Sequence, residues 1–282
     1  MKKSVKGALA IAAGLVGLFV GGGVTAQATA LPGTAKSAYL RNTTGYVRLK
    51  KTMYVGIYQK SGKKIKPLLK RKGSLLAIGG IGGAQADKDK AGNIVIRAAF
   101  TSGAVHYQRL KKLSYNGKIS IPFTKAHFKT ATLKAPVRTL LFRKGTGFET
   151  NEMGLITPAA FYLTLDNYLQ SYSATAMAKF SPSGSEGRLA AYEVWKPTSA
   201  VKVSKVTVKG RTTTIDYRQP VAGMPNKKVA KQHYRLTIKD LNQKHSQSFF
   251  PVDDTYDSQG TWNDYTVNGK RYYVGSMENG LD

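Results

Sequence analysis

Side chains able to do acid–base or metal chemistry are sparse in this 282-residue chain, which has four histidines and no cysteine. The absence of cysteine excludes disulfides, thiol catalysis and zinc sites built from thiolates. The histidines lie at spacings that do not fit a metal site, and no His-Glu-x-x-His motif occurs. We therefore expect no metal, no cofactor and no catalytic residue among them, and a structural or surface role for each: His106, His127, His233 and His245.

Carboxylates leave one catalytic alternative open. A carboxylate-based hydrolase needs two acids that face each other across a cleft, and any two of the 15 acids could form such a pair. Glu193 is the acid most clearly embedded in a strand pattern. We expect it to be exposed or ion-paired rather than catalytic.

Two further polar motifs are incomplete. The glycines at 79–83 do not form a phosphate-binding loop, because Gln85 stands where the third glycine belongs, and we interpret them as a loop joining two strands. The acidic loops 87–94 and 253–260 each lack residues that a calcium loop requires. A hairpin turn explains the first of them better.

Basic residues carry the strongest chemical signal. The formal net charge is +29, with 44 Lys and Arg against 15 acids. The densest cluster lies at 60–72, where a solvated hairpin and a polyanion-binding surface are both consistent with the pattern. Because lysine is a mobile point charge, the composition favours unspecific attraction to many phosphates. The predicted polyanion-binding residues are Lys60, Lys63, Lys64, Lys66, Lys70, Arg71 and Lys72.

The charge is distributed unevenly along the chain. Residues 31–150 hold 25 Lys and Arg against only 3 acids, whereas residues 151–282 hold 16 against 12. Solubility alone gives no reason to exclude carboxylates from so long a segment. The asymmetry therefore predicts that the first half binds a polyanion.

The N-terminus predicts export. Three lysines precede an uncharged, mostly apolar run at 7–24, and Ala26 and Ala28 then provide a cleavage site after residue 28, with an equivalent site after Ala30. We interpret residues 1–28 as a signal peptide and 29–45 as a linker. A retained transmembrane anchor is the alternative, but the run is rich in glycine and no basic cluster follows it closely. We expect an extracellular, wall-associated protein with no membrane segment after cleavage.

The rest of the sequence predicts strands, because β-branched and aromatic runs alternate with Gly, Asn, Pro and Ser. Strands are expected at 53–58, 93–100 and 105–110, and at 234–239, where apolar and polar residues alternate as on a half-buried strand. Hairpins are expected around Asn116-Gly117, Lys209-Gly210 and Asn268-Gly269. Single helical turns are expected near 124–129 and 226–232. Weak internal matches, such as 106–110 with 233–236, suggest a duplication, so we divide the chain into a basic β module at 46–130 and a second module at 131–282 with an insertion at about 166–226.

One segment resembles a known family. Residues 54–64 and 68–74, with 268–275, resemble the strand–turn–strand of S-layer-associated wall-binding repeats, which are similar to bacterial SH3-like barrels. The resemblance implies small SH3-like barrels and noncovalent attachment to wall polymers such as teichoic acids. We therefore expect an all-β fold with two small SH3-like barrel or sandwich modules.

These observations lead to a functional hypothesis. We expect a secreted, non-enzymatic surface protein that binds an anionic wall polymer, a teichoic or lipoteichoic acid, through its lysine-rich module. Tyr54 and Tyr58 are candidates for stacking on sugars, although strand tyrosines also pack in cores. The alternatives are a wall-active hydrolase that carries a basic targeting module, and an extracellular nucleic-acid binder. No sequence signature supports specific nucleic-acid recognition.

Overall fold

The computed structural model describes residues 38–40, 45–83, 86–101, 105–115, 121–151, 154–179, 196–249 and 258–279. Strands dominate these residues, and the two described helices have only four and five residues, which confirms the all-β class. The predicted signal peptide, almost all of the predicted linker, Glu193, the Asn116-Gly117 turn and the acidic loop up to residue 257 lie outside the described residues.

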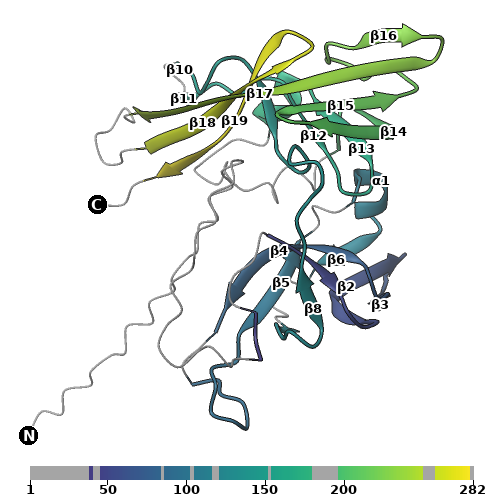
Figure 1. Ribbon diagram of the computed structural model, residues 1–282, viewed down its shortest axis with the longest axis vertical. Coiled ribbons are helices and arrows are strands. Elements are labelled where there is room, and N and C mark those ends of the chain that lie inside the picture. Colours follow the sequence, from purple (N-terminus) through teal and green to yellow (C-terminus); the bar gives the residue numbers. More distant parts are fainter. Residues whose placement is uncertain are drawn as a thin grey trace, which may run out of the picture.

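Two small sheets form the N-terminal half, at the bottom of Figure 1. One has the strand order β7-β5-β4-β1-β8 and the other has the order β3-β2-β6. Their elements are β1 (Tyr46–Leu49), β2 (Met53–Ser61), β3 (Lys64–Lys70), β4 (Leu75–Gly82), β5 (Arg97–Thr101), α1 (Tyr107–Leu110), β6 (Leu113–Tyr115), β7 (Ile121–Pro122) and β8 (Phe128–Thr130).

One hydrophobic core lies between these sheets. Val47 and Leu49 of β1 are buried in it while Arg48 is exposed, as the alternation of side chains along a strand requires. In β2, Val55 and Ile57 lie two residues apart on one face and both reach the core, while Gly56 between them has a φ of 74° and lies in a bulge. β2 thus has one face against the core and one face toward solvent.

The C-terminal half, at the top of Figure 1, is built on longer strands. Its elements are β9 (Phe142–Lys144), β10 (Thr150–Asn151), β11 (Gly154–Leu155), β12 (Ala160–Leu163), β13 (Tyr168–Tyr172), α2 (Ala174–Ala178), β14 (Ser199–Lys209), β15 (Thr212–Tyr217), β16 (Lys227–Ala230), β17 (His233–Phe249), β18 (Ser258–Val267) and β19 (Lys270–Asn279).

Eight of these strands form a closed ring. The sheet runs β15-β14-β13-β12-β9-β19-β18-β17, and β17 pairs with β15 again. All of these pairings are antiparallel. Each strand of the ring contributes a buried residue to a single core, from Phe142 of β9 to Tyr272 of β19. A closed sheet of this size is just wide enough to be filled by side chains.

Three tyrosines place hydroxyl groups in or near this ring core. Burial raises the pKa of Tyr217, Tyr265 and Tyr272, the last to about 12. The Tyr217 hydroxyl donates a hydrogen bond to the side chain of Asn226 at 2.8 Å. The folded ring therefore favours neutral tyrosines.

The two halves meet at α1. The His106 ring stacks on Tyr168 with centroids 3.7 Å apart, and its Nδ1 lies 2.9 Å from Asp166 Oδ2. The backbone N–H groups of His106 and Tyr107 donate to Asp166 and Gln170, respectively. Side chains of the β12–β13 hairpin thus satisfy the first donors of a helix in the other half.

Several local predictions are confirmed. The hairpin around Gly210 joins β14 to β15, and β18 turns into β19 at Asn268 and Gly269, which both have positive φ. β2 covers the strand expected at 53–58, and β17 shows the expected alternation of buried and exposed residues.

Other local predictions are wrong. Residues 107–110 form a helix rather than a strand, because the contacts to Asp166 and Gln170 supply its N-terminal hydrogen bonds. The match between 106–110 and 233–236 therefore pairs a helix with a strand. Gly79, Gly80 and Gly82 lie within β4 rather than in a loop. No helical turn forms at 226–232, which contributes to β16, whereas residues 124–128 do form a single turn, in which the Thr124 backbone oxygen accepts hydrogen bonds from the N–H groups of His127 and Phe128 before β8.

Residues 166–226, the predicted insertion, supply β13, β14 and β15 of the ring. No helix in the described part of the chain has the length and apolar character needed to cross a membrane.

The tyrosines of the ring predict a loss of stability at alkaline pH. A pKa raised by folding stabilises the protein below the unfolded value of 10.0 and loses that contribution as the pH rises above it. We expect the free energy of unfolding in urea to fall above about pH 10, by up to about 1.4 kcal/mol per pH unit for each tyrosine. Tyr272→Phe should flatten the decline. Lysine deprotonation relieves repulsion and has the opposite sign, but it is common to both proteins, so equal pH dependence of the unsubstituted protein and the Tyr272→Phe variant above about pH 10 would contradict the prediction.

Gly275 in β19 predicts a steric requirement. A Cβ at this position would lie 2.3 Å from the backbone oxygen of Thr261. Gly275→Ala should therefore destabilise the protein by about 2 kcal/mol or more, as measured by urea unfolding. Gly80→Ala is the matched control, because nothing lies within 4 Å of a Cβ there. Equal stabilities of the two variants would refute the close approach of β18 and β19 at this point.

Candidate polyanion-binding surface

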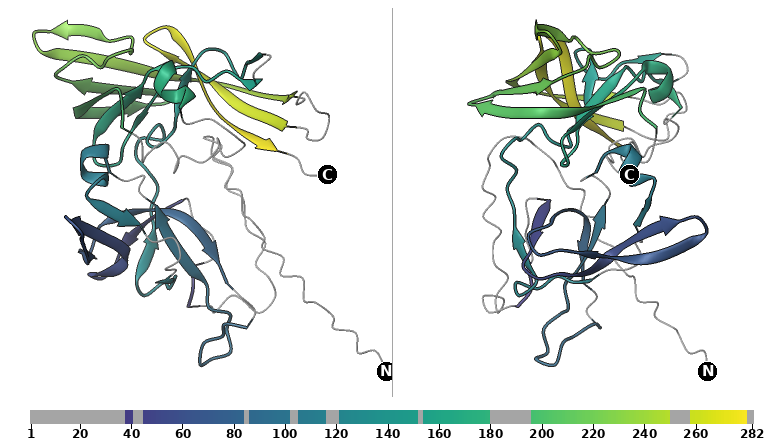
Figure 2. Two further views of the ribbon diagram at one scale, coloured as in Figure 1. Left: turned by 180° about the vertical axis from the view of Figure 1, so that it is seen from behind. Right: turned by 90° about the vertical axis from the view of Figure 1, so that its right-hand side faces the viewer.

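The predicted polyanion-binding residues lie on a hairpin that projects from the N-terminal half, as Figure 2 shows for β2 and β3. We call β2, β3, their turn and the following Arg71 and Lys72 the basic hairpin. Lys60 pairs with Ile65 and Ser61 pairs with Lys64, so the turn is formed by Gly62 and Lys63. Gly62 has a φ of 58°, which a glycine adopts at little cost.

Basic residues occupy both ends of this hairpin. Lys60, Lys63, Lys64 and Lys66 surround the tip and are exposed. Lys70, Arg71 and Lys72 lie at the base, about 20 Å away by the rise of a seven-residue strand. Six of the seven predicted residues are exposed, whereas Lys70 is half-buried, and burial together with nearby Arg109 lowers its pKa.

Further basic residues, which the sequence analysis did not include, adjoin the hairpin. β6 pairs with β2, and the backbone N–H of Lys60 donates to the backbone oxygen of Lys112 at 2.8 Å. Exposed Arg109, Lys111 and Lys112 therefore extend the basic surface beside the hairpin. The sequence shows that these three residues cluster at 109–112, but it does not show that they belong to this surface, because only the β2–β6 pairing brings them next to Lys60.

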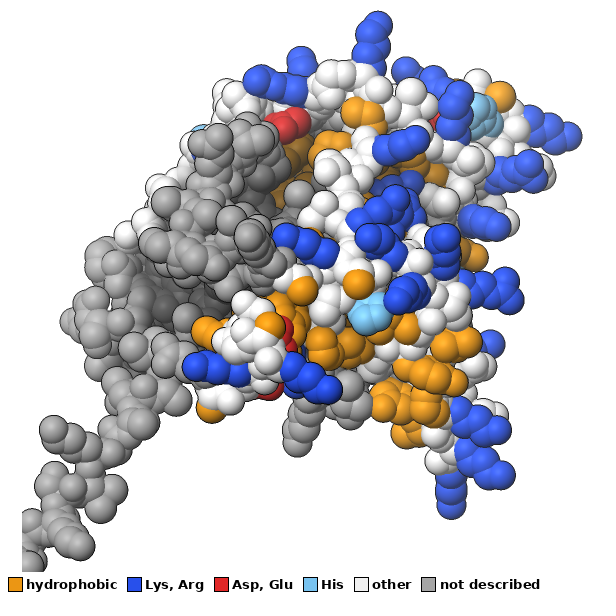
Figure 3. All heavy atoms as spheres, turned by 60° about the horizontal axis from the view of Figure 1, so that its bottom comes forward, with side chains coloured by type: hydrophobic (Ala, Val, Ile, Leu, Met, Phe, Trp, Pro, Cys, Tyr) orange, Lys and Arg blue, Asp and Glu red, His pale blue; other side chains and the backbone are white. Residues whose placement is uncertain are grey.

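The candidate stacking residues lie on the solvent face of the hairpin. Tyr54 is 58% exposed and pairs with Leu69, and half-buried Tyr58 pairs with Pro67. Figure 3 shows apolar side chains beside Lys and Arg at the lower right of the molecule. Neither tyrosine belongs to a core cluster.

Acids do not neutralise this surface within the described residues. The six ion pairs found there involve Asp87, Asp166, Asp216 and Asp264, and none includes a residue of the basic hairpin. Figure 3 accordingly shows many blue side chains along one margin and few red ones. The positive charge of the hairpin is therefore not compensated by ion pairs within the described part of the chain.

The histidines contact acids. His106 bonds to Asp166, His233 Nε2 lies 3.1 Å from Asp216, and His245 Nε2 lies 3.2 Å from Asp264. His127 instead pairs with the Thr124 hydroxyl at 2.8 Å. The described residues contain no group of three His, Cys, Asp or Glu suited to hold a metal ion.

Asp216 is the centre of one buried polar cluster. Burial raises its pKa, but hydrogen bonds from Arg235, at 2.8 Å, and from His233 outweigh that effect and hold the pKa below its usual value. Asp264 is also buried beside basic side chains: His245 and Arg271 flank its Oδ2, and Trp262 stacks on His245. Its Oδ1 has no hydrogen-bond partner. Each acid faces basic groups, not a second carboxylate.

The loop at 87–94 forms a turn. Asp89 Oδ1 accepts hydrogen bonds from the backbone N–H groups of Ala91 and Asn93, and Lys88 bridges to Ile94. Asp87 bonds to Arg97 at 2.8 Å. Both carboxylates are therefore engaged, as the hairpin interpretation of this loop predicts.

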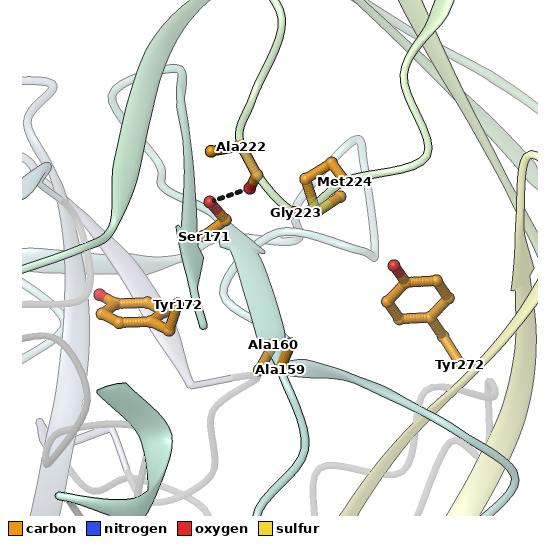
Figure 4. A pocket seen from close by; sticks show the side chains of 8 residues that line it. All are labelled: Ala159, Ala160, Ser171, Tyr172, Ala222, Gly223, Met224 and Tyr272. Carbon is orange, nitrogen blue, oxygen red and sulfur yellow. Dashed lines mark hydrogen bonds between the residues drawn. The ribbon is translucent and has the colours of Figure 1, made fainter. Parts of the chain in front are cut away.

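A small cavity lies at the edge of the ring (Figure 4). It is lined by Ser171, Tyr172, Met224, Tyr272 and small residues, and the Ser171 hydroxyl donates to the backbone oxygen of Ala222 at 2.9 Å. Its volume of about 10 Å³ leaves room for about one water molecule. A sugar or nucleotide does not fit there, so the projecting hairpin is the better candidate for a binding site.

The Asp216 cluster predicts a pH-dependent contribution to stability. Its lowered pKa stabilises the fold above about pH 4, and this contribution is lost as the pH falls through the folded-state pKa. Asp216→Asn should lower the free energy of unfolding by about 1–3 kcal/mol at neutral pH, with a gap that closes toward pH 3. Asp87→Asn is the control, because its pair with Arg97 is more than one-third exposed on both sides and should matter little. A gap that does not vary with pH would exclude the charged form of Asp216 as its cause.

Comparison of the chain with protein-family models, with curated proteins and with solved structures gave no match.

Proposed function

We propose that this protein is exported and binds an anionic cell-wall polymer of the teichoic-acid type, noncovalently, through the basic hairpin. The observation that carries the proposal is a projecting set of exposed lysines with no described acid in ion-pair contact with it. The export part rests on the signal-peptide pattern of residues 1–28.

A linear polyphosphate suits this surface for physical reasons. Lysines at the tip and base of the hairpin lie about 20 Å apart along β3, so different phosphates along one polymer molecule can contact both groups of lysines. Binding releases condensed counterions, and the affinity therefore falls steeply as the salt concentration rises. The mobile ammonium groups tolerate variation in the polymer, because they make no fixed bidentate contacts.

Tyr54 adds a contact that charge alone does not provide. Its ring is 58% exposed on the same hairpin and offers an apolar face to a sugar or polyol unit between phosphates. Such a contact would favour a wall polymer over inorganic polyphosphate. The SH3-like, S-layer-associated resemblance of the same segment supports the assignment as an analogy.

The proposal predicts that the position of the charge matters, not only its amount. Replacing Lys60, Lys63, Lys64 and Lys66 with Gln should lower the affinity for purified teichoic acid by about tenfold or more near physiological salt, and should reduce the slope of log K against log salt. The control variant replaces four exposed lysines of the C-terminal half with Gln: Lys205 and Lys209 of β14, and Lys227 and Lys228 of β16. Both variants have the same net charge.

Two results would overturn the proposal. One is an equal loss of affinity in the two variants, which would assign binding to net charge. The other is displacement of bound teichoic acid by single-stranded or duplex DNA at equal phosphate concentration, which would favour the nucleic-acid alternative. Isothermal titration at three salt concentrations provides both readouts.

A further inference from the structure

Exposed apolar side chains are concentrated on the solvent face of the basic hairpin. Ile65 is 57% exposed and Leu69 is 48% exposed, and both lie on β3 with Pro67 between them on the same face. Across the hairpin, Tyr54 pairs with Leu69 and Tyr58 pairs with Pro67. We call these five residues, Tyr54, Tyr58, Ile65, Pro67 and Leu69, the apolar strip.

This concentration distinguishes the strip from ordinary surface variation. Six large apolar residues are strongly exposed in the described chain, and three of them are on this hairpin: Tyr54, Ile65 and Leu69. The others, Ile156, Val208 and Val229, lie on separate elements. Single exposed apolar residues need no explanation, whereas a contiguous patch with a polar rim marks an interaction site.

The rim of the strip is basic. On the face of the strip, Lys60 lies opposite Ile65 and exposed Lys63 stands at the adjoining turn, whereas Lys64 and Lys66 alternate with Ile65 and Pro67 and project from the other face of β3. A soluble polyphosphate requires the lysines but has no acyl chains to cover Ile65 and Leu69. A surface with both negative headgroups and apolar depth satisfies both sets of side chains, because lysine stems can lie on apolar material while their ammonium groups reach phosphates.

We propose that the apolar strip docks onto an anionic lipid bilayer, with Ile65 and Leu69 at the acyl boundary and the surrounding lysines at the headgroup phosphates. The hairpin can approach such a surface because it projects from the N-terminal half (Figure 2). This function goes beyond polymer binding, because it uses Ile65 and Leu69, which a soluble polymer does not need, together with the lysines and Tyr54 that the proposed function also uses.

A second copy of this chain fits the strip less well. Docking of two strips face to face would bring the two lysine rims together, which repel each other. Pairing through the free edge of β3 is hindered by Pro67, which lacks the N–H that an added strand would require. The charge of the rim therefore favours an anionic partner over self-association.

Depth-dependent quenching tests the proposal directly. Ile65→Trp places a fluorophore in the strip, and Val208→Trp, on exposed β14, is the matched control. The full chain is mixed with vesicles of phosphatidylcholine and brominated-acyl phosphatidylglycerol in equal parts, and the emission of the unsubstituted protein is subtracted. We expect emission from residue 65 to shift to the blue and to be quenched at least about twofold more than emission from residue 208. Vesicles of brominated phosphatidylcholine alone should produce little quenching at either position, because they lack the negative headgroups.

Equal quenching at residues 65 and 208 would overturn the proposal, and so would equal quenching of residue 65 by neutral and anionic vesicles.

A second variant separates this proposal from polymer binding. Ile65→Ser combined with Leu69→Ser keeps every charge, so this variant should retain its affinity for soluble teichoic acid. On anionic vesicles, Lys63 of the unsubstituted protein should be protected from an amine-acylating reagent, and this protection should be lost in the variant. Loss of teichoic-acid affinity in this variant would assign the strip to the polymer and overturn the bilayer proposal. Absence of teichoic-acid binding by the unsubstituted protein would refute only the proposed function.

Discussion

Closure of the ring by the pairing of β15 with β17 is the constraint on which the rest of the structure depends. It holds the β12–β13 hairpin in place, and the turn of that hairpin and the first half of β13 present Asp166, Tyr168 and Gln170 to His106 and α1. The anchored α1 leads directly into β6, which pairs with β2. The orientation of the basic hairpin therefore depends on the ring, although the two are far apart in sequence.

The arrangement of acids increases the charge asymmetry that the sequence already shows. Asp216 and Asp264 are buried against arginine and histidine in the ring, so their negative charges are neutralised locally. The basic hairpin has no such compensation among the described residues. The proposed binding surface thus lies apart from the two hydrophobic cores, and its exposed lysines can vary with little effect on either core.

Local patterns predicted those parts of the fold that depend on neighbouring residues. The Asn268-Gly269 turn was predictable because both positions adopt positive φ, and β17 because its side chains alternate between core and solvent. The lysine cluster was predictable because exposure of lysine is the rule. The helix at Tyr107–Leu110 was not, because its N-terminal donors are satisfied by side chains about sixty residues away. The glycines of β4 likewise look like a loop until β1 and β5 pair with them.

The sequence by itself determined the all-β class, the hairpin turns and the concentration of lysine at 60–72, because propensity, φ preference and charge belong to single residues or close neighbours. Only the tertiary structure decided that eight strands close into a ring, that Arg109, Lys111 and Lys112 join the basic hairpin, and that Ile65 and Leu69 remain exposed beside the lysines. These outcomes depend on pairing between distant strands and on which face of a strand meets a core, and neither is encoded within a short window of sequence.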